Sequence, residues 1–214
     1  MQTVLDAILR EKLIVIVRGL PKDKLVPFAE AVYKGGVRLL ELTYSANGSC
    51  PEEETAENIR ILAEHFAGRM HIGAGTVLTP RQVELTKNAG GKFIISPNTN
   101  ESVIRKTREL GLISIPGALT PTEVEAAHEA GADFVKLFPI GNLGPGYLKA
   151  VAAPLSHIKF LAVGGVNEKN ARDYLDAGAC GVGVGGGMTD KTLIAENRWD
   201  LIEELAAAFV AALH

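Results

Sequence analysis

The chain repeats one pattern along its length: a short apolar run, followed by a longer stretch whose apolar residues have helical spacing. Such a repeat is typical of α/β proteins, in which each buried strand is followed by a helix that covers the sheet. The apolar runs predict strands at Leu13–Val17, Arg38–Leu42, His71–Gly75, Lys92–Ser96, Leu112–Ile115, Phe134–Phe138, Lys159–Val163 and Gly181–Val184.

The stretches between these strands predict helices. Two of them open with Thr79-Pro80 and Thr120-Pro121, which place a capping threonine before a proline at the first helical position. Glycine is expected to end several helices, at Gly35, Gly90, Gly111, Gly131 and Gly178. The expected helices are Lys24–Lys34, Glu53–Phe66, Pro80–Ala89, Glu101–Leu110, Pro121–Ala130, Pro145–Ala152, Glu168–Ala177 and Arg198–Leu213, after a short amphipathic helix within Met1–Arg10.

Eight strand–helix units follow one another without a linker, a charge block or a low-complexity stretch. Eight such units in 214 residues favour a closed parallel (β/α)8 barrel, the TIM barrel, with an extra N-terminal helix. We therefore expect an α/β fold with a single domain over residues 1–214. An open, doubly wound sheet is the alternative architecture.

Polar and glycine residues cluster directly after the expected strands. In a parallel barrel the carboxyl ends of all strands share one face, and the chemistry of such barrels lies there. We expect these clusters to line one mouth. They are Arg18-Gly19, Glu41 with Thr43, Gly73 to Thr76, Ser96 to Asn98, Pro116-Gly117, Pro139, Gly164-Gly165 and Gly185 to Gly187.

Lys136 stands in the middle of Phe134–Phe138, a run whose two faces are both apolar. A buried ammonium must either pair with a carboxylate or lower its pKa and become a neutral amine. A neutral lysine amine is a nucleophile that forms Schiff bases with carbonyl substrates. A structural lysine, paired in the core or extended to the rim, also fits this strand. Lys92 and Lys159 open their strands instead, so we expect both to be solvated and ordinary.

Glu41 lies among leucines in the second strand, and alternation places it on the same face as Thr43. Burial should raise the pKa of this carboxyl, which suits proton transfer near neutral pH. Lys136 is its obvious buried partner. Structural pairing and catalysis therefore merge in this case, because a Schiff-base mechanism needs a neighbouring group that moves protons. Thr43, beside Glu41, is a candidate for substrate binding.

The glycines after the last two strands form a second constellation, Gly164 and Gly165 in one turn and Gly185, Gly186 and Gly187 in the other. Glycine lets backbone N–H groups approach a phosphate closely, and barrels often bind phosphate between these two loops. Tight turns without a ligand would use the same residues. Their place in the chain favours phosphate binding.

Arg18 follows the first strand and faces the same mouth. It fits either a fork that binds a substrate carboxylate or phosphate, or a salt bridge at the rim. Thr76, Pro97 and Phe138 are expected to line the substrate pocket, although each also fits ordinary packing.

Composition and charge exclude several other classes. The net charge of −3 leaves no basic surface for nucleic acid. The histidines and the two cysteines, Cys50 and Cys180, lack metal-ligand spacing, so we expect neither a metal nor another cofactor. The longest apolar run, Leu205–Leu213, is too short to span a membrane, and no secretory signal is visible. We expect a cytoplasmic protein.

An ordered set of short motifs resembles a known family. The motifs are Glu41-Leu42-Thr43, Gly73-Ala74-Gly75-Thr76-Val77, Ile95-Ser96-Pro97, Pro116-Gly117, Val135-Lys136-Leu137-Phe138-Pro139 and Val163-Gly164-Gly165-Val166. In this order they resemble the class I aldolases that act on 2-keto-3-deoxy-6-phosphogluconate, on its galactonate epimer and on 4-hydroxy-2-oxoglutarate. The resemblance extends over nearly the whole chain.

The resemblance implies a (β/α)8 barrel, usually a homotrimer, that releases pyruvate and an aldehyde such as glyceraldehyde 3-phosphate. It implies that Lys136 is the Schiff-base lysine and Glu41 the general acid/base. The pocket residues around the pyruvyl group would be Thr76, Pro97 and Phe138. The phosphate site would be formed by Gly164, Gly165 and the turn of Gly185, Gly186 and Gly187.

Two positions depart from the pattern of the phosphogluconate-specific members. Ser45 stands where those members usually carry arginine, and Gly187 replaces a serine that often contributes to the phosphate site. The missing arginine also fits the galactonate branch. Arg18 is a candidate for the anion contact that the absent arginine would supply, and the Ser45–Glu54 loop is a candidate lid or subunit contact.

Three functions compete at this stage. The leading hypothesis is a metal-independent retro-aldol lyase that acts on a 2-keto-3-deoxy sugar acid through Lys136 and Glu41. A phosphosugar isomerase or epimerase would use the same phosphate turns but would leave Lys136 unexplained. A non-catalytic barrel that binds a phosphorylated metabolite would leave both Lys136 and Glu41 unexplained.

Overall fold

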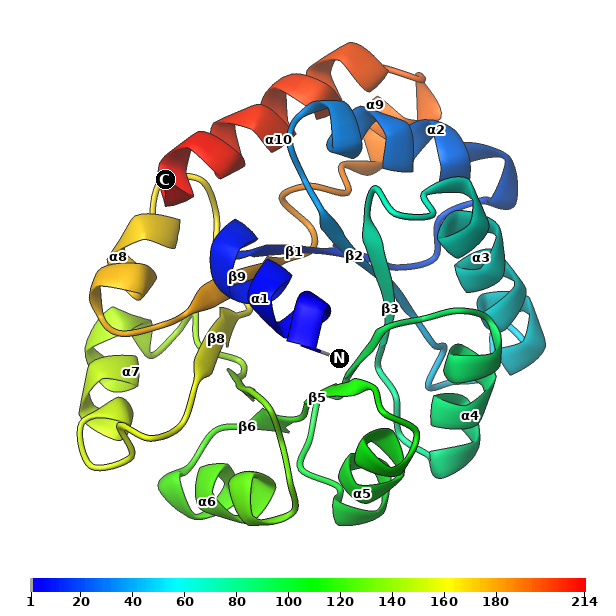
Figure 1. Cartoon of the computed structure of the whole chain (residues 1–214). Coiled ribbons are helices and arrows are strands. Elements are labelled where there is room, and N and C mark those ends of the chain that lie inside the picture. Colours follow the sequence, from blue (N-terminus) through cyan, green and yellow to red (C-terminus); the bar gives the residue numbers. More distant parts are fainter. Residues whose placement is uncertain (1) are drawn as a thin grey trace.

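Parallel strands form a barrel inside a ring of helices in the computed structural model, which describes residues 2–214 (Figure 1). Each expected strand region contains a strand, although several strands are one or two residues shorter than the apolar run. The strands are β1 (Leu13–Val17), β2 (Leu39–Thr43), β3 (His71–Gly75), β4 (Phe93–Ile95), β5 (Ile113–Ile115), β6 (Gly117–Ala118), β7 (Val135–Leu137), β8 (Phe160–Val163) and β9 (Gly181–Val184).

The expected fifth strand ended at Ile115, but a further two-residue strand, β6, follows it and was not predicted. Pro116, which has no N–H to donate to a sheet, separates β5 from β6. The sheet order is β5-β4-β3-β2-β1-β9-β8-β7-β6. Its two end strands, β5 and β6, therefore belong to one segment, which pairs with β4 on one side and with β7 on the other. The Lys136 N–H donates to the Pro116 carbonyl at 2.9 Å across this point. The barrel is thus nearly closed, and the open-sheet alternative is wrong.

The helices cover the outside of the barrel (Figure 1). Pattern and structure agree closely on most of their ends. The helices are α1 (Gln2–Glu11), α2 (Lys22–Lys34), α3 (Glu52–His65), α4 (Pro80–Asn88), α5 (Glu101–Glu109), α6 (Pro121–Glu129), α7 (Gly144–Ala152), α8 (Ala171–Asp176), α9 (Lys191–Ala195) and α10 (Trp199–Leu213). The expected N-terminal helix is confirmed as α1, and Met1 lies outside the described residues.

Two helix predictions need correction. The hydrophobic pattern missed α9, because a five-residue helix has no periodicity to detect. Its signal was Asp190, whose carboxylate caps the helix by accepting from the N–H groups of Thr192 and Leu193. The expected α8 began at Glu168, but Glu168 lies in the turn before the helix, which starts at Ala171.

Side chains cap the starts of α4, α5, α6 and α9. Thr79 and Thr120 both form capping boxes, with Gln82 and Glu123 respectively. Helix α2 ends at Gly35 as expected, and the left-handed residue is the next one, Gly36, with φ of 100°. Gly35 has a different role. A Cβ there would lie 2.5 Å from Ala206 Cβ, so glycine lets α2 approach α10 closely.

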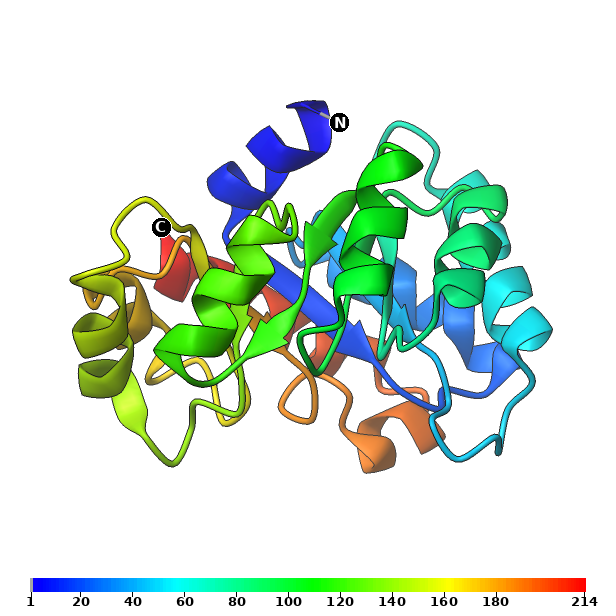
Figure 2. The same ribbon diagram turned by 90° about the horizontal axis from the view of Figure 1, so that it is seen from below.

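Helix α1 lies across one end of the barrel (Figure 2). Its Val4 and Ile8 belong to the same buried cluster as Ile14, Phe93 and Phe134 of the barrel region. The loops that follow the strands gather at the opposite end (Figure 2). Among the helices of residues 2–214, none combines the length and the apolar composition that a membrane span requires.

Candidate active site

A cavity of about 390 Å³ lies at the carboxyl ends of the strands. It brings together the residues that the sequence predicted for catalysis, substrate binding and phosphate binding, with the exception of Thr43. Its lining consists of Ile16, Arg18, Glu41, Thr76, Pro97, Lys136, Phe138, Val163, Gly164, Gly165, Val166, Gly183, Gly185, Gly186 and Gly187. We call it the catalytic cavity.

Lys136 is 7% exposed in the centre of β7, and its Nζ lies 4.4 Å from the centroid of the Phe138 ring. Burial lowers the pKa of this amine, and the nearby Arg18 cation lowers it further, against the opposite effect of Glu41. The structure thus bears out the expected direction. A buried amine with a lowered pKa is the group that attacks carbonyl carbons.

Glu41 is 2% exposed in the centre of β2. Burial raises the pKa of its carboxyl to about 7, although the Lys136 and Arg18 cations pull that pKa down. Its Oε2 atom is buried and has no hydrogen-bond partner. Such a carboxyl exchanges a proton near neutral pH, and one of its oxygens is not committed to another protein group.

Glu41 and Lys136 act on each other through the cavity rather than through a contact. Strand β2 pairs with β1 and β3, whereas β7 pairs with β6 and β8, so the two groups lie on opposite parts of the ring. Each still shifts the pKa of the other. The expected pairing is therefore a longer-range electrostatic interaction, and both groups line the catalytic cavity.

Gly75 makes room for the Glu41 carboxyl. A Cβ at Gly75 would lie 2.5 Å from Glu41 Oε1, too close for any other residue unless the carboxylate moved. Gly73, on the same strand, has a packing role instead, because a Cβ there would lie 2.4 Å from the Phe93 ring. Sequence reasoning marked both glycines as part of a mouth but did not find the contact with Glu41.

Thr76 has an unusual backbone, with φ of 53°, directly after β3. Left-handed conformations are rare for β-branched residues and tend to occur at functional sites. Its hydroxyl accepts a hydrogen bond of 3.2 Å from the guanidinium of Arg18, which is exposed at the mouth. The two neighbouring pocket residues expected from the sequence, Pro97 and Phe138, line the same cavity.

The two glycine turns also lie in the catalytic cavity. Gly164 and Gly165 are both left-handed, with φ of 94° and 79°. A Cβ at Gly165 would lie 2.8 Å from the Cα of Gly141, and one at Gly164 would lie 3.3 Å from the Phe138 ring. Gly186 has nothing within 4 Å of its Cβ direction, so its backbone is open to a ligand. These turns present backbone N–H groups of the kind that hold phosphate.

Thr43 does not line the catalytic cavity. It lines an adjoining cavity of about 610 Å³, between the loop after β1 and the loop after β2, and Arg18 is common to both cavities. We call it the side cavity. The sequence did not decide whether the Ser45–Glu54 loop is a lid or a subunit contact. It also did not reveal this cavity, or Asn58 of α3, which contributes to it. Which face of a helix meets a cavity depends on the loop before it, and nothing in the local pattern specifies that.

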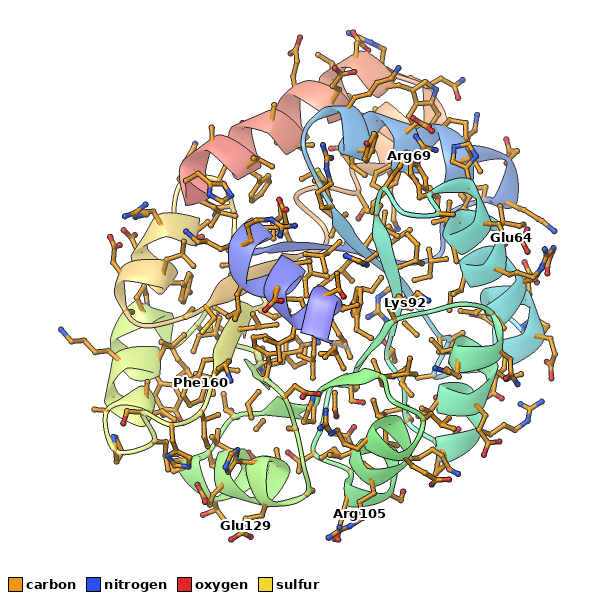
Figure 3. The ribbon with its side chains drawn as sticks, viewed as in Figure 1. Glu64, Arg69, Lys92, Arg105, Glu129 and Phe160 are labelled. Atoms are coloured by element: carbon orange, nitrogen blue, oxygen red, sulfur yellow. The ribbon has the colours of Figure 1, made fainter. Side chains whose placement is uncertain are left out.

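Lys92 and Lys159 behave as expected. Both are exposed and both precede the first residue of a strand, β4 and β8 respectively (Figure 3 for Lys92). Within residues 2–214, no group of three or more His, Cys, Asp and Glu side chains is arranged to hold a metal ion. Glu129 and Arg105, by contrast, lie at the outer edge of the helical ring (Figure 3).

Sequence comparisons agree with this arrangement. The family model described as KDPG and KHG aldolase matches residues 5–205. The chain is 36% identical over 201 residues to 2-dehydro-3-deoxy-6-phosphogalactonate aldolase of Escherichia coli, covering 94% of this chain and 93% of that one. It is 34% identical over 202 residues to 2-dehydro-3-deoxy-phosphogluconate aldolase of Haemophilus influenzae, covering 92% of this chain and 91% of that one.

A solved structure supports the same grouping. KDPG aldolase from Legionella pneumophila, with pyruvate captured at low pH as a covalent carbinolamine intermediate, matches with a TM-score of 0.86. It is 29% identical, and the match covers 98% of this chain and 99% of that chain. Barrel, buried lysine and family match lead to one assignment: the chain belongs to the KDPG and KHG aldolase family and is a class I aldolase, a carbon–carbon lyase.

Proposed function

We propose that this aldolase cleaves a 6-phosphorylated 2-keto-3-deoxy sugar acid, of the gluconate or galactonate type, to pyruvate and glyceraldehyde 3-phosphate. One observation carries the proposal: a single cavity holds a buried amine with a lowered pKa and a buried carboxyl with a pKa raised to about 7. Near neutral pH, burial therefore favours a free amine and a protonated acid in the same site.

Lys136 forms the covalent intermediate. Its neutral Nζ attacks the C2 ketone of the substrate and gives a carbinolamine. Glu41 then donates a proton to the departing hydroxyl, water leaves, and an iminium forms between Nζ and C2. Burial supports this step twice, because it lowers the pKa of the nucleophilic amine and raises the pKa of the acid.

The iminium takes up the electron pair of the bond that breaks. Glu41, now ionised, accepts the proton of the C4 hydroxyl as the C3–C4 bond cleaves and the aldehyde is released. The remaining enamine is protonated at C3, and water hydrolyses the resulting iminium to pyruvate and free Lys136. Thr76, Pro97 and Phe138 would surround the pyruvyl group, since all three line the same cavity.

Arg18 and the two glycine turns hold the phosphate in this proposal. Arg18 is a cation at the mouth, and Gly164, Gly165 and Gly186 offer backbone N–H groups without obstructing side chains. Relatives named for both epimers are similarly close, so the stereochemistry at C4 is left as two alternatives. Ser45 stands where the phosphogluconate-specific members usually carry arginine, and by the family resemblance this favours the galactonate type.

Trapping the Schiff base tests the function. We expect incubation with pyruvate and borohydride to add one reduced pyruvyl group to the wild type. Lys136→Ala should gain none, because the nucleophile is gone, whereas Lys159→Ala, which removes an exposed lysine, should react like the wild type. Intact mass spectrometry measures all three. A wild type without an adduct would exclude the mechanism and favour an isomerase or a non-catalytic metabolite-binding barrel.

A further inference from the structure

The side cavity lies directly beside the catalytic cavity. Arg18 lines both, and Thr43 of the side cavity lies on the same strand as Glu41, two residues beyond it. A ligand held at Lys136 that extends past Arg18 therefore enters the side cavity. Its volume of about 610 Å³ exceeds the 390 Å³ of the catalytic cavity, so it has room for several further carbon atoms.

The polar groups of the side cavity are mainly uncharged. They come from the end of β2, the loop after it and α3, and they include Thr43, Ser45, Asn47, Ser49, Thr55 and Asn58. The charged groups besides Arg18 are Lys22 and Glu54, which carry opposite signs. Hydroxyl and amide side chains both donate and accept hydrogen bonds, as do sugar hydroxyls. The lining thus matches a neutral hydroxylated chain better than an anion.

Asn58 gives the most specific indication. Its Oδ1 is buried without a hydrogen-bond partner, although the residue lines the cavity from α3. An unsatisfied buried polar group is costly, and proteins rarely keep one without a reason. Ser45, by contrast, already bonds Asn47 Oδ1 at 2.7 Å and Ser49 Oγ at 2.8 Å. Asn58 is therefore the lining residue with an unpaired amide oxygen, which a rotation of its side chain would bring to a ligand hydroxyl.

We propose that the side cavity binds the unphosphorylated, polyhydroxylated end of a longer 2-keto-3-deoxy sugar acid, or of the aldehyde it releases. The inference rests on the proposed Schiff-base function. The enzyme then accepts two substrate classes. Phosphorylated chains end at Arg18 and the glycine turns, and longer neutral chains continue past Arg18 toward Asn58.

Aldol addition in the synthetic direction tests this assignment. The enamine of pyruvate attacks the aldehyde carbon of an acceptor, which forms the C3–C4 bond and converts the aldehyde oxygen to a hydroxyl. We compare kcat/KM for erythrose, a neutral four-carbon aldose, with kcat/KM for glyceraldehyde 3-phosphate. The variants are Ser49→Phe, which fills the cavity from an exposed position, and Asn58→Leu, which removes the unused polar group at similar size.

Both variants should lower the ratio of the erythrose value to the phosphate value, Ser49→Phe by at least about tenfold and Asn58→Leu by up to about tenfold, as expected for one lost hydrogen bond. Ser156→Phe is the matched control, an exposed serine that lines none of the described cavities, and its ratio should equal that of the wild type. The midpoint temperature of Asn58→Leu should not fall, because its Oδ1 has no partner to lose.

Two results would overturn the proposal: a wild type that does not accept erythrose, or an unchanged ratio in both variants. The pyruvate–borohydride adduct separates this proposal from the preceding one. An adduct in the wild type with no effect of the side-cavity variants would remove only the side-cavity assignment, whereas a missing adduct would remove the Schiff-base function itself.

Discussion

At the scale of single residues, burial disfavours the charged forms of both Lys136 and Glu41. It lowers the pKa of Lys136 and raises that of Glu41, so both groups move toward their neutral forms. Their mutual attraction opposes both shifts without overcoming either. A buried salt bridge would have made the lysine a poor nucleophile. Separation across the barrel preserves its reactivity.

Glu41 should make the protein less stable as pH rises. Its pKa moves from 4.5 to about 7 on folding, so the folded state binds the proton more tightly than the unfolded state does. The stability that this proton provides is complete below about pH 4.5 and is lost between about pH 4.5 and 7. We expect Glu41→Gln to exceed the wild type in unfolding free energy by roughly 3 kcal/mol at pH 8 and by little at pH 4.

Chemical denaturation at the two pH values measures this difference. Glu129→Gln is the control, because Glu129 lies exposed on the outer face of the helical ring (Figure 3). Its effect should be small and equal at both pH values. A Glu41→Gln variant that is no more stable than the wild type at pH 8 would contradict the raised pKa.

The same scale shows what the sequence can reveal. Lys136 and Glu41 were recognisable because a charge inside an apolar strand stands out from its neighbours. The contact of Gly75 with Glu41 was not, because it depends on how two strands approach each other. Asn58 was missed for a similar reason, since it lies in a helix whose orientation depends on the preceding loop.

At the scale of elements, short turns supply the phosphate site, and their shape depends on glycine. Gly165 has φ of 79° and closely approaches Gly141. The left-handed conformation costs a residue with a Cβ about 1–2 kcal/mol, and a clash with backbone adds to this. A side chain at Gly165 should therefore alter the turn after β8 itself.

We expect Gly165→Ala to raise the KM for the phosphorylated substrate at least about tenfold, as loss of charge-assisted contacts predicts, while the pyruvate adduct still forms. Gly111→Ala is a matched control for backbone strain, because Gly111 has φ of 70°, nothing within 4 Å of its Cβ direction, and a place at the end of α5. It should lose stability but keep its KM. Steady-state kinetics and thermal unfolding separate the two effects, and an equal rise of KM in both variants would argue against a phosphate site in this turn.

Element ends were predictable where side-chain chemistry defines them. Thr79 and Thr120 are followed three residues later by Gln82 and Glu123, which is the sequence form of a capping box. The short strand β6, which lies beyond Pro116, was not predicted. A proline can end a strand or interrupt a longer one, and the hydrogen bonds on both sides decide which.

At the scale of the whole molecule, every group in the proposed mechanism comes from one chain. We propose a cytoplasmic homotrimer that works in carbohydrate metabolism, as the family resemblance implies. Native mass spectrometry should then show three times the mass of one chain. Dilution that yields monomers should leave the pyruvate adduct intact, because Lys136, Glu41 and Arg18 line a cavity formed within one chain. Loss of the adduct on dissociation would mean that a partner completes the site.

Helix α1 closes the end of the barrel opposite the mouth, with Val4 and Ile8 in the inner core (Figure 2). That end of the barrel is therefore covered, and molecules reach the catalytic cavity from the mouth, at the carboxyl ends of the strands. While pyruvate is still attached to Lys136, the aldehyde lies between it and the solvent and has to leave first. In the reverse direction pyruvate must enter before the aldehyde. The order of arrival and departure thus follows from a helix that takes no part in the chemistry.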